Sequence, residues 1–185
     1  NAELAALGEP FDVARYNTNA TVAENLLFGT PVDETFAEAS LATNAYVLEV
    51  LEKAELTKDL LESGRQMAQT MVELFSGLPP GHEFFDQFSF ISSEDLPEFQ
   101  TLLGRVNKTG LDELDGEDRA RLLSLPFMLI PARHRLGLID EAMEGKILAA
   151  RKLFAEGLPE ALQGAIEFLD AERYAGAATI QDNVL

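Results

Sequence analysis

The sequence of 185 residues contains no cysteine, few basic side chains and no long apolar run. The absence of cysteine excludes disulfides, thiolate nucleophiles, zinc ribbons and iron–sulfur clusters. The longest uninterrupted apolar stretch, residues 125–132, has eight residues including two prolines, whereas a membrane-spanning helix needs about 20 apolar residues. We therefore expect no direct insertion of this chain into a membrane.

Basic residues are outnumbered by acidic ones, 14 against 32, which gives a formal net charge of −18. Such a charge repels phosphate backbones, so nucleic acid is not an expected partner. The imbalance is uneven, because residues 1–104 carry 18 acids and 4 bases, residues 105–152 carry 8 and 9, and residues 153–185 carry 6 and 1. The near-neutral section is either ordinary solvated surface or a basic contact surface around Arg133, His134 and Arg135.

The content of apolar residues, 46%, is enough to fill the core of one globular domain. Apolar side chains recur at steps of three and four, which is the spacing of a helical face. No region alternates with a period of two between turn residues, which is the strand signal. We predict an all-α fold, an irregular bundle of about six helices with a long ordered loop near residues 78–92 that has room for a short strand.

Capping and stop signals give these helices their expected limits. A helix over about 35–54 would begin at a Thr35–Glu38 capping box. The other expected helices run from Thr57 to a stop at Gly77, from Ser92 or Ser93 to residues 107–110, over 115–124 before Pro126, over about 139–157 with Arg151 on a polar face, and onward from Pro159.

An internal repeat is the most informative feature of the sequence. Residues 15–27 match residues 173–185 without a gap, and six of the 13 positions are identical. One interpretation is that Thr21 with Glu24, and Thr179 with Asp182, merely cap helices. Capping does not explain the shared Arg-Tyr pair or the shared Asn25 and Asn183, so we interpret the two stretches as copies of one segment.

The first copy, Thr-Val-Ala-Glu-Asn-Leu-Leu-Phe-Gly over residues 21–29, resembles a segment in the ATP-binding subunits of ABC transporters. In that family the segment follows the Q-loop and leads into the helical subdomain that meets the membrane-spanning partner. The resemblance covers about residues 11–29 and 173–185. It carries Thr21, Glu24, Asn25, Thr179, Asp182 and Asn183 over as residues that shape the subdomain, and it gives none of them a catalytic role.

Several motifs of that family are missing from this sequence. No phosphate-binding Gly-x-x-x-x-Gly-Lys-[Ser/Thr] loop, no Leu-Ser-Gly-Gly-Gln signature and no apolar strand ending in Asp-Glu occurs. No glutamine stands near residues 11–13, where the resemblance places the Q-loop glutamine. We therefore expect no enzyme activity, cofactor or metal in this fragment, while ATP and Mg²⁺ belong to the parent that the resemblance implies. Only His82 and His134 are present, and we interpret both as structural.

The repeat and the resemblance together predict three parts: residues 1–32 as a first junction copy, 33–170 as a helical insertion domain, and 171–185 as a truncated second copy. The chain begins with Asn1 instead of methionine and has no stop signal at residue 185, so we expect an excerpt of a longer protein. The resemblance implies contacts with the rest of the ATPase subunit and with a membrane-spanning partner, at the cytoplasmic face of a membrane. The alternative is a free-standing acidic helical module that binds other proteins.

Overall fold

The structure is a computed structural model that describes residues 12–88 and 90–169. These residues are mostly helical and contain one two-stranded sheet, so the predicted all-α class is confirmed. They form two compact units, which are described separately here: unit 1 comprises residues 12–57 and 129–169, and unit 2 comprises Lys58–Met128. No helix in the described part of the chain has both the length and the apolar content to cross a bilayer.

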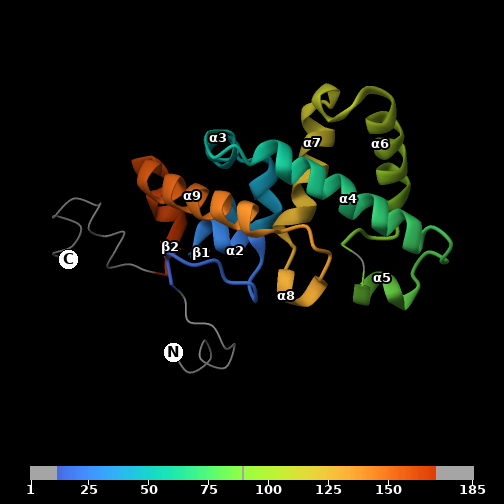
Figure 1. Cartoon of the computed structure of the whole chain (residues 1–185), viewed down its shortest axis with the longest axis horizontal. Coiled ribbons are helices and arrows are strands. Elements are labelled where there is room, and N and C mark those ends of the chain that lie inside the picture. Colours follow the sequence, from blue (N-terminus) through green and yellow to red (C-terminus); the bar gives the residue numbers. More distant parts are fainter. Residues whose placement is uncertain (1–11, 89, 170–185) are drawn as a thin grey trace. The chain divides into compact units, whose positions relative to one another are not determined.

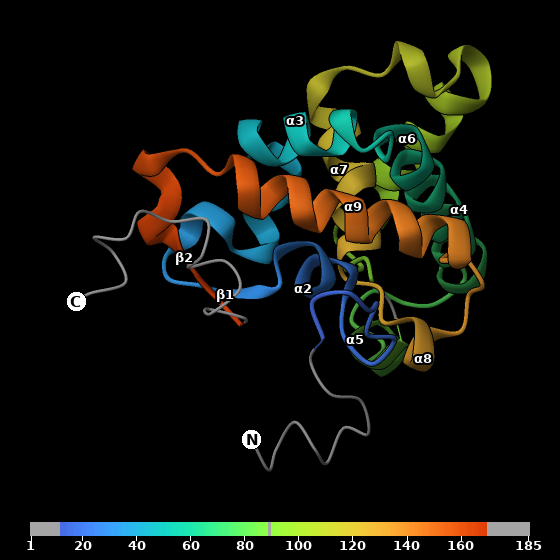
Figure 2. The same ribbon diagram turned by 60° about the vertical axis from the view of Figure 1, so that its left-hand side comes forward.

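Unit 1 is built around its longest helix, α9 (Glu141–Gly157), which packs against α2 (Val22–Leu27) and α3 (Ala45–Lys53). Figures 1 and 2 both show α9 beside these two helices. The other elements of the unit are β1 (Gly29–Pro31), η1 (Glu34–Phe36), η2 (Glu38–Thr43), α8 (Pro131–His134), η4 (Glu160–Ala165) and β2 (Ile166–Phe168).

The core of unit 1 centres on Phe154 of α9, which is fully buried. Its ring meets the ring of Phe36 edge-on, with centroids 5.1 Å apart, and it also contacts the rings of Tyr46 and Phe168. Edge-to-face contacts add to the free energy that burial of the rings supplies. The core therefore joins segments from both ends of the described chain.

The two strands β1 and β2 pair in antiparallel register, with Gly29 opposite Phe168 and Pro31 opposite Ile166. The pairing continues at one end, where the N–H of Leu169 donates to the carbonyl oxygen of Phe28 at 2.9 Å. Gly29 is required for this close approach, because a Cβ at that position would lie 2.8 Å from the carbonyl oxygen of Glu167.

Unit 2 contains α4 (Thr57–Phe75), whose first residue closes unit 1, then α5 (Glu83–Phe88), α6 (Leu96–Thr109), η3 (Leu111–Glu113) and α7 (Gly116–Phe127). Helix α4 has the predicted limits. Helix α6 begins with Pro97 in its first turn and ends at Gly110, as predicted. The expected loop near 78–92 contains the short helix α5, so that prediction is only partly right.

Helix α7 continues through Pro126 to Phe127, so the prediction that Pro126 would stop it is wrong. Proline has no N–H, and the carbonyl of Leu122 therefore does not receive the usual helical hydrogen bond from residue 126. Gly64 of α4 lies against this carbonyl, and a Cβ at Gly64 would overlap the Leu122 oxygen. The absence of a side chain at Gly64 is what allows α4 and α7 to pack here.

The predicted helix over 35–54 is also wrong in its first half. The chain forms η1 and η2 there, and α3 begins only after Asn44, whose side chain accepts a hydrogen bond from the N–H of Val47 at 3.0 Å. The Asn44 side-chain amide also donates to the Thr35 carbonyl at 2.9 Å. Asn44 thus caps α3 and stabilises the preceding turn, while Asp33 takes the cap of η1 in place of Thr35.

The predicted final helix from Pro159 is replaced by η4 and by strand β2. The helical spacing of Leu162, Ile166 and Leu169 suggested a helix, but the N–H of Leu169 is used in pairing with Phe28 instead. Pairing with a strand more than 130 residues away overrides this local pattern.

Candidate functional site

The first repeat copy forms a capped helix, as its sequence predicts. The Thr21 hydroxyl accepts a hydrogen bond from the N–H of Glu24 at 3.0 Å, and the Glu24 carboxylate accepts one from the N–H of Thr21 at 2.7 Å. This reciprocal pair is a capping box at the start of α2. Phe28 ends the helix in the left-handed region, with φ at 46°. Thr21 and Glu24 thus shape the segment locally.

The side chain of Asn25, a residue of α2, bonds to the backbone of the loop that precedes the helix. Its Oδ1 accepts from the N–H of Asn17 at 2.8 Å, and its Nδ2 donates to the carbonyl oxygens of Asn17 and Thr21, both at 2.9 Å. The side chain is only 2% exposed. A buried amide with all these bonds fixes the loop before α2 against the helix itself.

Arg151 of α9 reaches this segment and binds it through several hydrogen bonds. Its Nε donates to the carbonyl oxygen of Asn25 at 2.7 Å and its Nη2 to the Asn25 Oδ1 at 3.1 Å. Its Nη1 donates to the carbonyl oxygens of Val13 at 2.7 Å, Arg15 at 3.1 Å and Asp12 at 3.3 Å. We call Arg151, with the backbone of residues 12–15 and with Asn25, the Arg151 cradle.

Arg151 is only 1% exposed, and burial of its charged guanidinium costs free energy unless the N–H donors are satisfied. The carbonyl oxygens supply this compensation, and the ring of Phe28 adds a cation–π contact with its centroid 4.4 Å from Cζ. Arginine suits such a site because its five N–H donors are fixed in one plane. Arg151 therefore joins α9 to the loop that precedes the first repeat copy.

Tyr16 lies close to this cradle, and its buried hydroxyl has no hydrogen-bond partner among the described residues. Burial raises the pKa of Tyr16 far above its ordinary value, the negative charge of Glu144 raises it further, and the positive charge of Arg151 opposes both effects. The phenol is therefore neutral at any physiological pH.

Arg133, His134 and Arg135 lie at the end of α8, a single helical turn. The side chains of Arg133 and Arg135 are exposed, whereas the Nδ1 of His134 accepts a hydrogen bond from the N–H of Ile130 at 2.9 Å. Partial burial, and next the charge of Arg133, lower the pKa of His134 below its ordinary value. Two of these three predicted contact residues are thus presented to solvent, and His134 stabilises the turn that carries them.

The α8 region also contacts the first repeat copy through two backbone hydrogen bonds. The N–H of Val22 donates to the carbonyl oxygen of Leu129, and the N–H of Ala132 donates to that of Thr18, both at 3.0 Å. The α8 turn that carries the predicted contact residues and the first repeat copy are therefore neighbours in unit 1. The other three predicted site residues, Thr179, Asp182 and Asn183, lie outside the described residues.

Arg151 was expected on a polar face of its helix, and its role in the cradle was not predicted from the sequence. Its position does carry a signal, because it stands four residues after the buried Ile147 and three before the buried Phe154. Those intervals put Arg151 at the edge of the apolar face of α9. A basic residue at such an interval suggests a buried cation with partners elsewhere in the chain.

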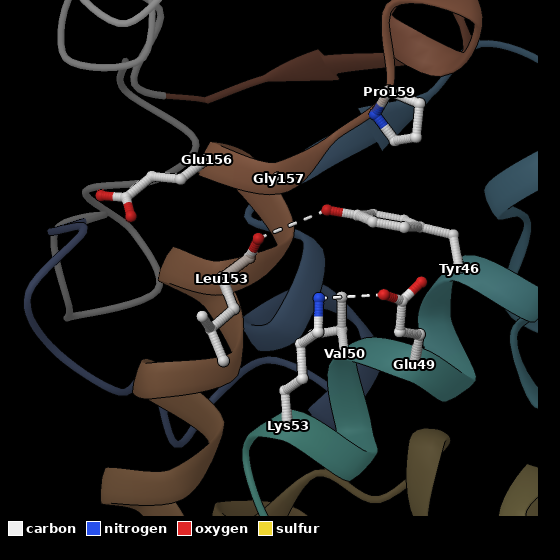
Figure 3. Close-up of a pocket in the computed structure, with 8 residues that line it drawn as sticks. All are labelled: Tyr46, Glu49, Val50, Lys53, Leu153, Glu156, Gly157 and Pro159. Carbon is white, nitrogen blue, oxygen red and sulfur yellow. Dashed lines mark hydrogen bonds and ion pairs between the residues drawn. The ribbon is translucent and has the colours of Figure 1, made fainter.

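An open groove of about 450 Å³ lies between α3 and the C-terminal end of α9, and Figure 3 shows the side chains that line it. The Tyr46 hydroxyl donates to the carbonyl oxygen of Phe154 at 2.6 Å, and Lys53 pairs with Glu49 at 2.9 Å. Burial, then the charge of Glu49, raise the pKa of Tyr46 to about 12. The Tyr46 hydroxyl thus joins α3 to α9, whereas Lys53 and Glu49 pair with each other within α3.

Residues 12–88 and 90–169 contain no cluster of three or more histidine, aspartate and glutamate side chains arranged to hold a metal ion. Comparisons with protein-family models, with curated proteins and with solved structures find no match to this chain. The candidate site is thus defined by the geometry of the Arg151 cradle and the neighbouring α8 turn.

Proposed function

We propose that this chain is a non-catalytic helical insertion from the ATP-binding subunit of an ABC-type transporter, and that it couples or regulates ATP-driven transport through protein contacts. The resemblance of residues 21–29 to that family, and the second copy over 173–185, support this origin. ATP and Mg²⁺ bind elsewhere in the parent subunit, and the insertion acts from the cytoplasmic face of the membrane.

The observation that carries the proposal is the pairing of Gly29 with Phe168. The first copy ends at residue 27 and the second begins at residue 173, so the chain between the copies leaves and returns at adjacent points. Insertions are tolerated in a host domain when their two ends lie close together. This is the geometry expected of a block spliced between duplicated junctions.

The Arg151 cradle supplies contacts through which a movement of the parent subunit would be transmitted to the insertion. The resemblance places the counterpart of the Q-loop near residues 11–13, where this sequence has no glutamine, and Arg151 bonds to the carbonyls of Asp12 and Val13. A shift of that loop would act directly on α9, because these hydrogen bonds join the backbone of the loop to a buried side chain of the helix. The exposed Arg133 and Arg135 then offer a basic surface to an acidic partner.

The decisive experiment removes the insertion from the parent subunit. Residues 32–165 are deleted and Pro31 is joined to Ile166 by an Asn-Gly turn, since a two-residue turn connects antiparallel strands. We expect ATP turnover or transport per ATP to change by about 5- to 150-fold, the usual range of coupling between sites. If both rates are unchanged, or if the parent has no phosphate loop upstream and no signature motif downstream, the proposal is wrong.

A double substitution tests whether the insertion acts through partner contacts of the α8 turn or only as a structural scaffold. Arg133→Ala with Arg135→Ala removes the exposed basic pair and should reduce coupling in the parent. The matched control, Lys58→Ala with Lys108→Ala, changes the charge equally at two exposed positions of unit 2 and should leave coupling unchanged. Equal effects of the two pairs would contradict a specific role for the α8 turn. A free-standing module would bind its partner without any ATPase parent.

A further inference from the structure

The loop between α4 and α5 of unit 2 exposes apolar side chains at both of its ends. Leu74, near the end of α4, is 64% exposed, and Phe84, in the first turn of α5, is 44% exposed. Within the loop, Pro79 and Pro80 are exposed and Leu78 is half-buried. Figure 1 shows this loop joining the C-terminal end of α4 to α5. We call these five residues the α4–α5 knob.

The centre of the knob is a turn with a fixed conformation. The N–H of His82 donates to the carbonyl oxygen of Pro79 at 3.1 Å, which closes a turn of four residues. Pro80, at the second position of the turn, has its φ fixed at about −65° by its ring. Gly81, at the third position, has φ at 81°. A negative φ followed by a positive one defines a type II turn, in which glycine is the favoured third residue.

Both ends of the loop are anchored in unit 2. The buried rings of Phe75 and Phe85 lie 5.2 Å apart between their centroids. Leu74 and Phe84 directly precede these two residues in the sequence, so both exposed side chains are close to one pair of buried rings. The Nδ1 of His82 also accepts a hydrogen bond from the N–H of Phe84 at 3.2 Å. The knob is therefore held in one conformation before any partner binds.

Acidic residues flank the knob, and basic residues are absent from this part of the sequence. Glu73 directly precedes Leu74, Glu83 directly precedes Phe84, and both glutamates are exposed. Residues 66–104 contain six acidic residues and no lysine or arginine. A complementary surface would therefore combine apolar side chains with basic ones.

The charge of the chain disfavours two other occupants of the knob. A second copy of the chain carries the same net charge of −18 and would be repelled. Anionic lipid head groups would be repelled by the glutamates beside the knob as well. A separate protein with a basic surface meets neither obstacle.

We propose that the α4–α5 knob binds another protein, on an apolar surface bordered by lysine or arginine side chains. Burial of the exposed apolar groups supplies the affinity, and the flanking glutamates select a basic border. The fixed turn lowers the conformational entropy that is lost on binding. The inference uses contacts of unit 2 alone and does not depend on the proposed function, whose contact surface is the α8 turn of unit 1.

A pair of peptides tests the kind of partner. The probe is a short amphipathic helix of leucine and lysine, and its control has glutamate in place of every lysine. Added to the full chain at about 0.15 M salt, the lysine peptide should shift the amide NMR signals of Leu74, Leu78 and Phe84. It should also bind at least about tenfold more tightly than the glutamate peptide. Equal binding of the two peptides, or shifts confined to other residues, would overturn the proposal.

A matched pair of variants separates the knob from other exposed apolar side chains. Leu74→Gln with Phe84→Gln removes the two most exposed groups of the knob. Val32→Gln with Leu169→Gln removes two groups of unit 1 whose exposed fractions, 63% and 45%, are nearly the same. We expect the first pair to weaken binding of the lysine peptide at least about tenfold and the second to leave it unchanged. Equal effects of the two pairs would overturn the proposal.

The turn can be tested without changing any apolar side chain of the knob. Gly81→Ala places a side chain in the left-handed region, so it should disfavour the turn and weaken binding about fivefold or more. Gly77→Ala is the control, because Gly77 does not have a positive φ and a Cβ there would meet nothing within 4 Å. Equal binding by the two variants would contradict the fixed turn. Knob signals that change with protein concentration in the absence of peptide would identify a second copy as the occupant, and that result too would overturn the proposal.

Discussion

Arg151 donates two hydrogen bonds to a single residue, Asn25, one to its backbone carbonyl oxygen at 2.7 Å and one to its side-chain Oδ1 at 3.1 Å. The two residues are 126 positions apart and both are buried. This contact joins α9 to the helix α2 that contains Asn25. Arg151 also bonds to the carbonyl oxygens of Asp12 and Val13, on which the proposed coupling depends.

Arg151→Lys should destabilise the chain by about 2–4 kcal/mol, because a single ammonium cannot reach both atoms of Asn25 and the carbonyls of Val13 and Arg15. Urea denaturation of the variant measures this loss. The neighbouring Lys152 has a side chain 68% exposed and lies 4.0 Å from Glu156. Lys152→Ala is therefore the control and should change stability by no more than about 0.5 kcal/mol. Equal unfolding midpoints for the two variants would contradict a stabilising role for the cradle.

Gly64→Ala should destabilise unit 2, since the new methyl group would overlap the carbonyl oxygen of Leu122 and push α4 away from α7. We expect a loss of about 1–3 kcal/mol. A Cβ at Gly104, inside α6, would meet nothing within 4 Å, so Gly104→Ala should instead stabilise the helix by about 0.5–1 kcal/mol. Thermal unfolding of both variants tests the opposite signs, and a stabilised Gly64→Ala would rule out the close approach.

His134 should make the chain less stable as the pH falls below neutrality. Its pKa is lowered in the folded state, so the unfolded chain binds a proton first, near the ordinary pKa of about 6.5. Stability is then fully present above that value and is lost as the pH falls from there toward the folded pKa. Protonation also replaces the Nδ1 acceptor used by Ile130 with a donor.

Denaturation at several pH values tests this contribution of His134. His134→Gln keeps an acceptor and removes the titration, so its stability should depend less on pH between about 7 and 5. If the stability of His134→Gln depended more steeply on pH than that of the unmodified chain, this prediction would be contradicted.

Tyr46 should ionise at an unusually high pH. Its pKa is raised from 10.0 to about 12, and that of Tyr16 is raised as well. In the variant Tyr174→Phe these are the two remaining tyrosines, so a spectroscopic titration of phenolate should show little ionisation at pH 10.0. Half-ionisation of one group at that pH would mean that Tyr46 is not held against α9.

Local signals in the sequence were enough to predict several elements. The Thr21–Glu24 capping box, the limits of α4 and the Asp115 cap of α7 each depend on residues within one or two helical turns. The pairing of β1 with β2 could not be predicted, because its partners are more than 130 residues apart and each strand has three residues. Three residues are too few to establish a period of two.

The residues of the candidate site were likewise predictable only where the signal is local in the sequence. The repeat predicts Asn25 as a site residue, and Asn25 is buried at the centre of the cradle. Its partner Arg151 was not predicted, because only the tertiary fold brings the two residues together. Arg133 and Arg135 are exposed as a contact surface requires, whereas the hydrogen bond of His134 to Ile130 depends on a turn that Pro131 begins. Composition alone does not distinguish an exposed cation from a buried one.

Gly29 and Phe168 are paired in the sheet. The two ends of the chain segment between them therefore lie side by side. Such a block can be circularly permuted: a short linker would join its natural ends, and new ends would be opened in an exposed turn such as the one at Gly81. Because its two ends are neighbours, the same segment can also be inserted into the hairpin loop of an unrelated carrier protein without separating the two strands of that hairpin.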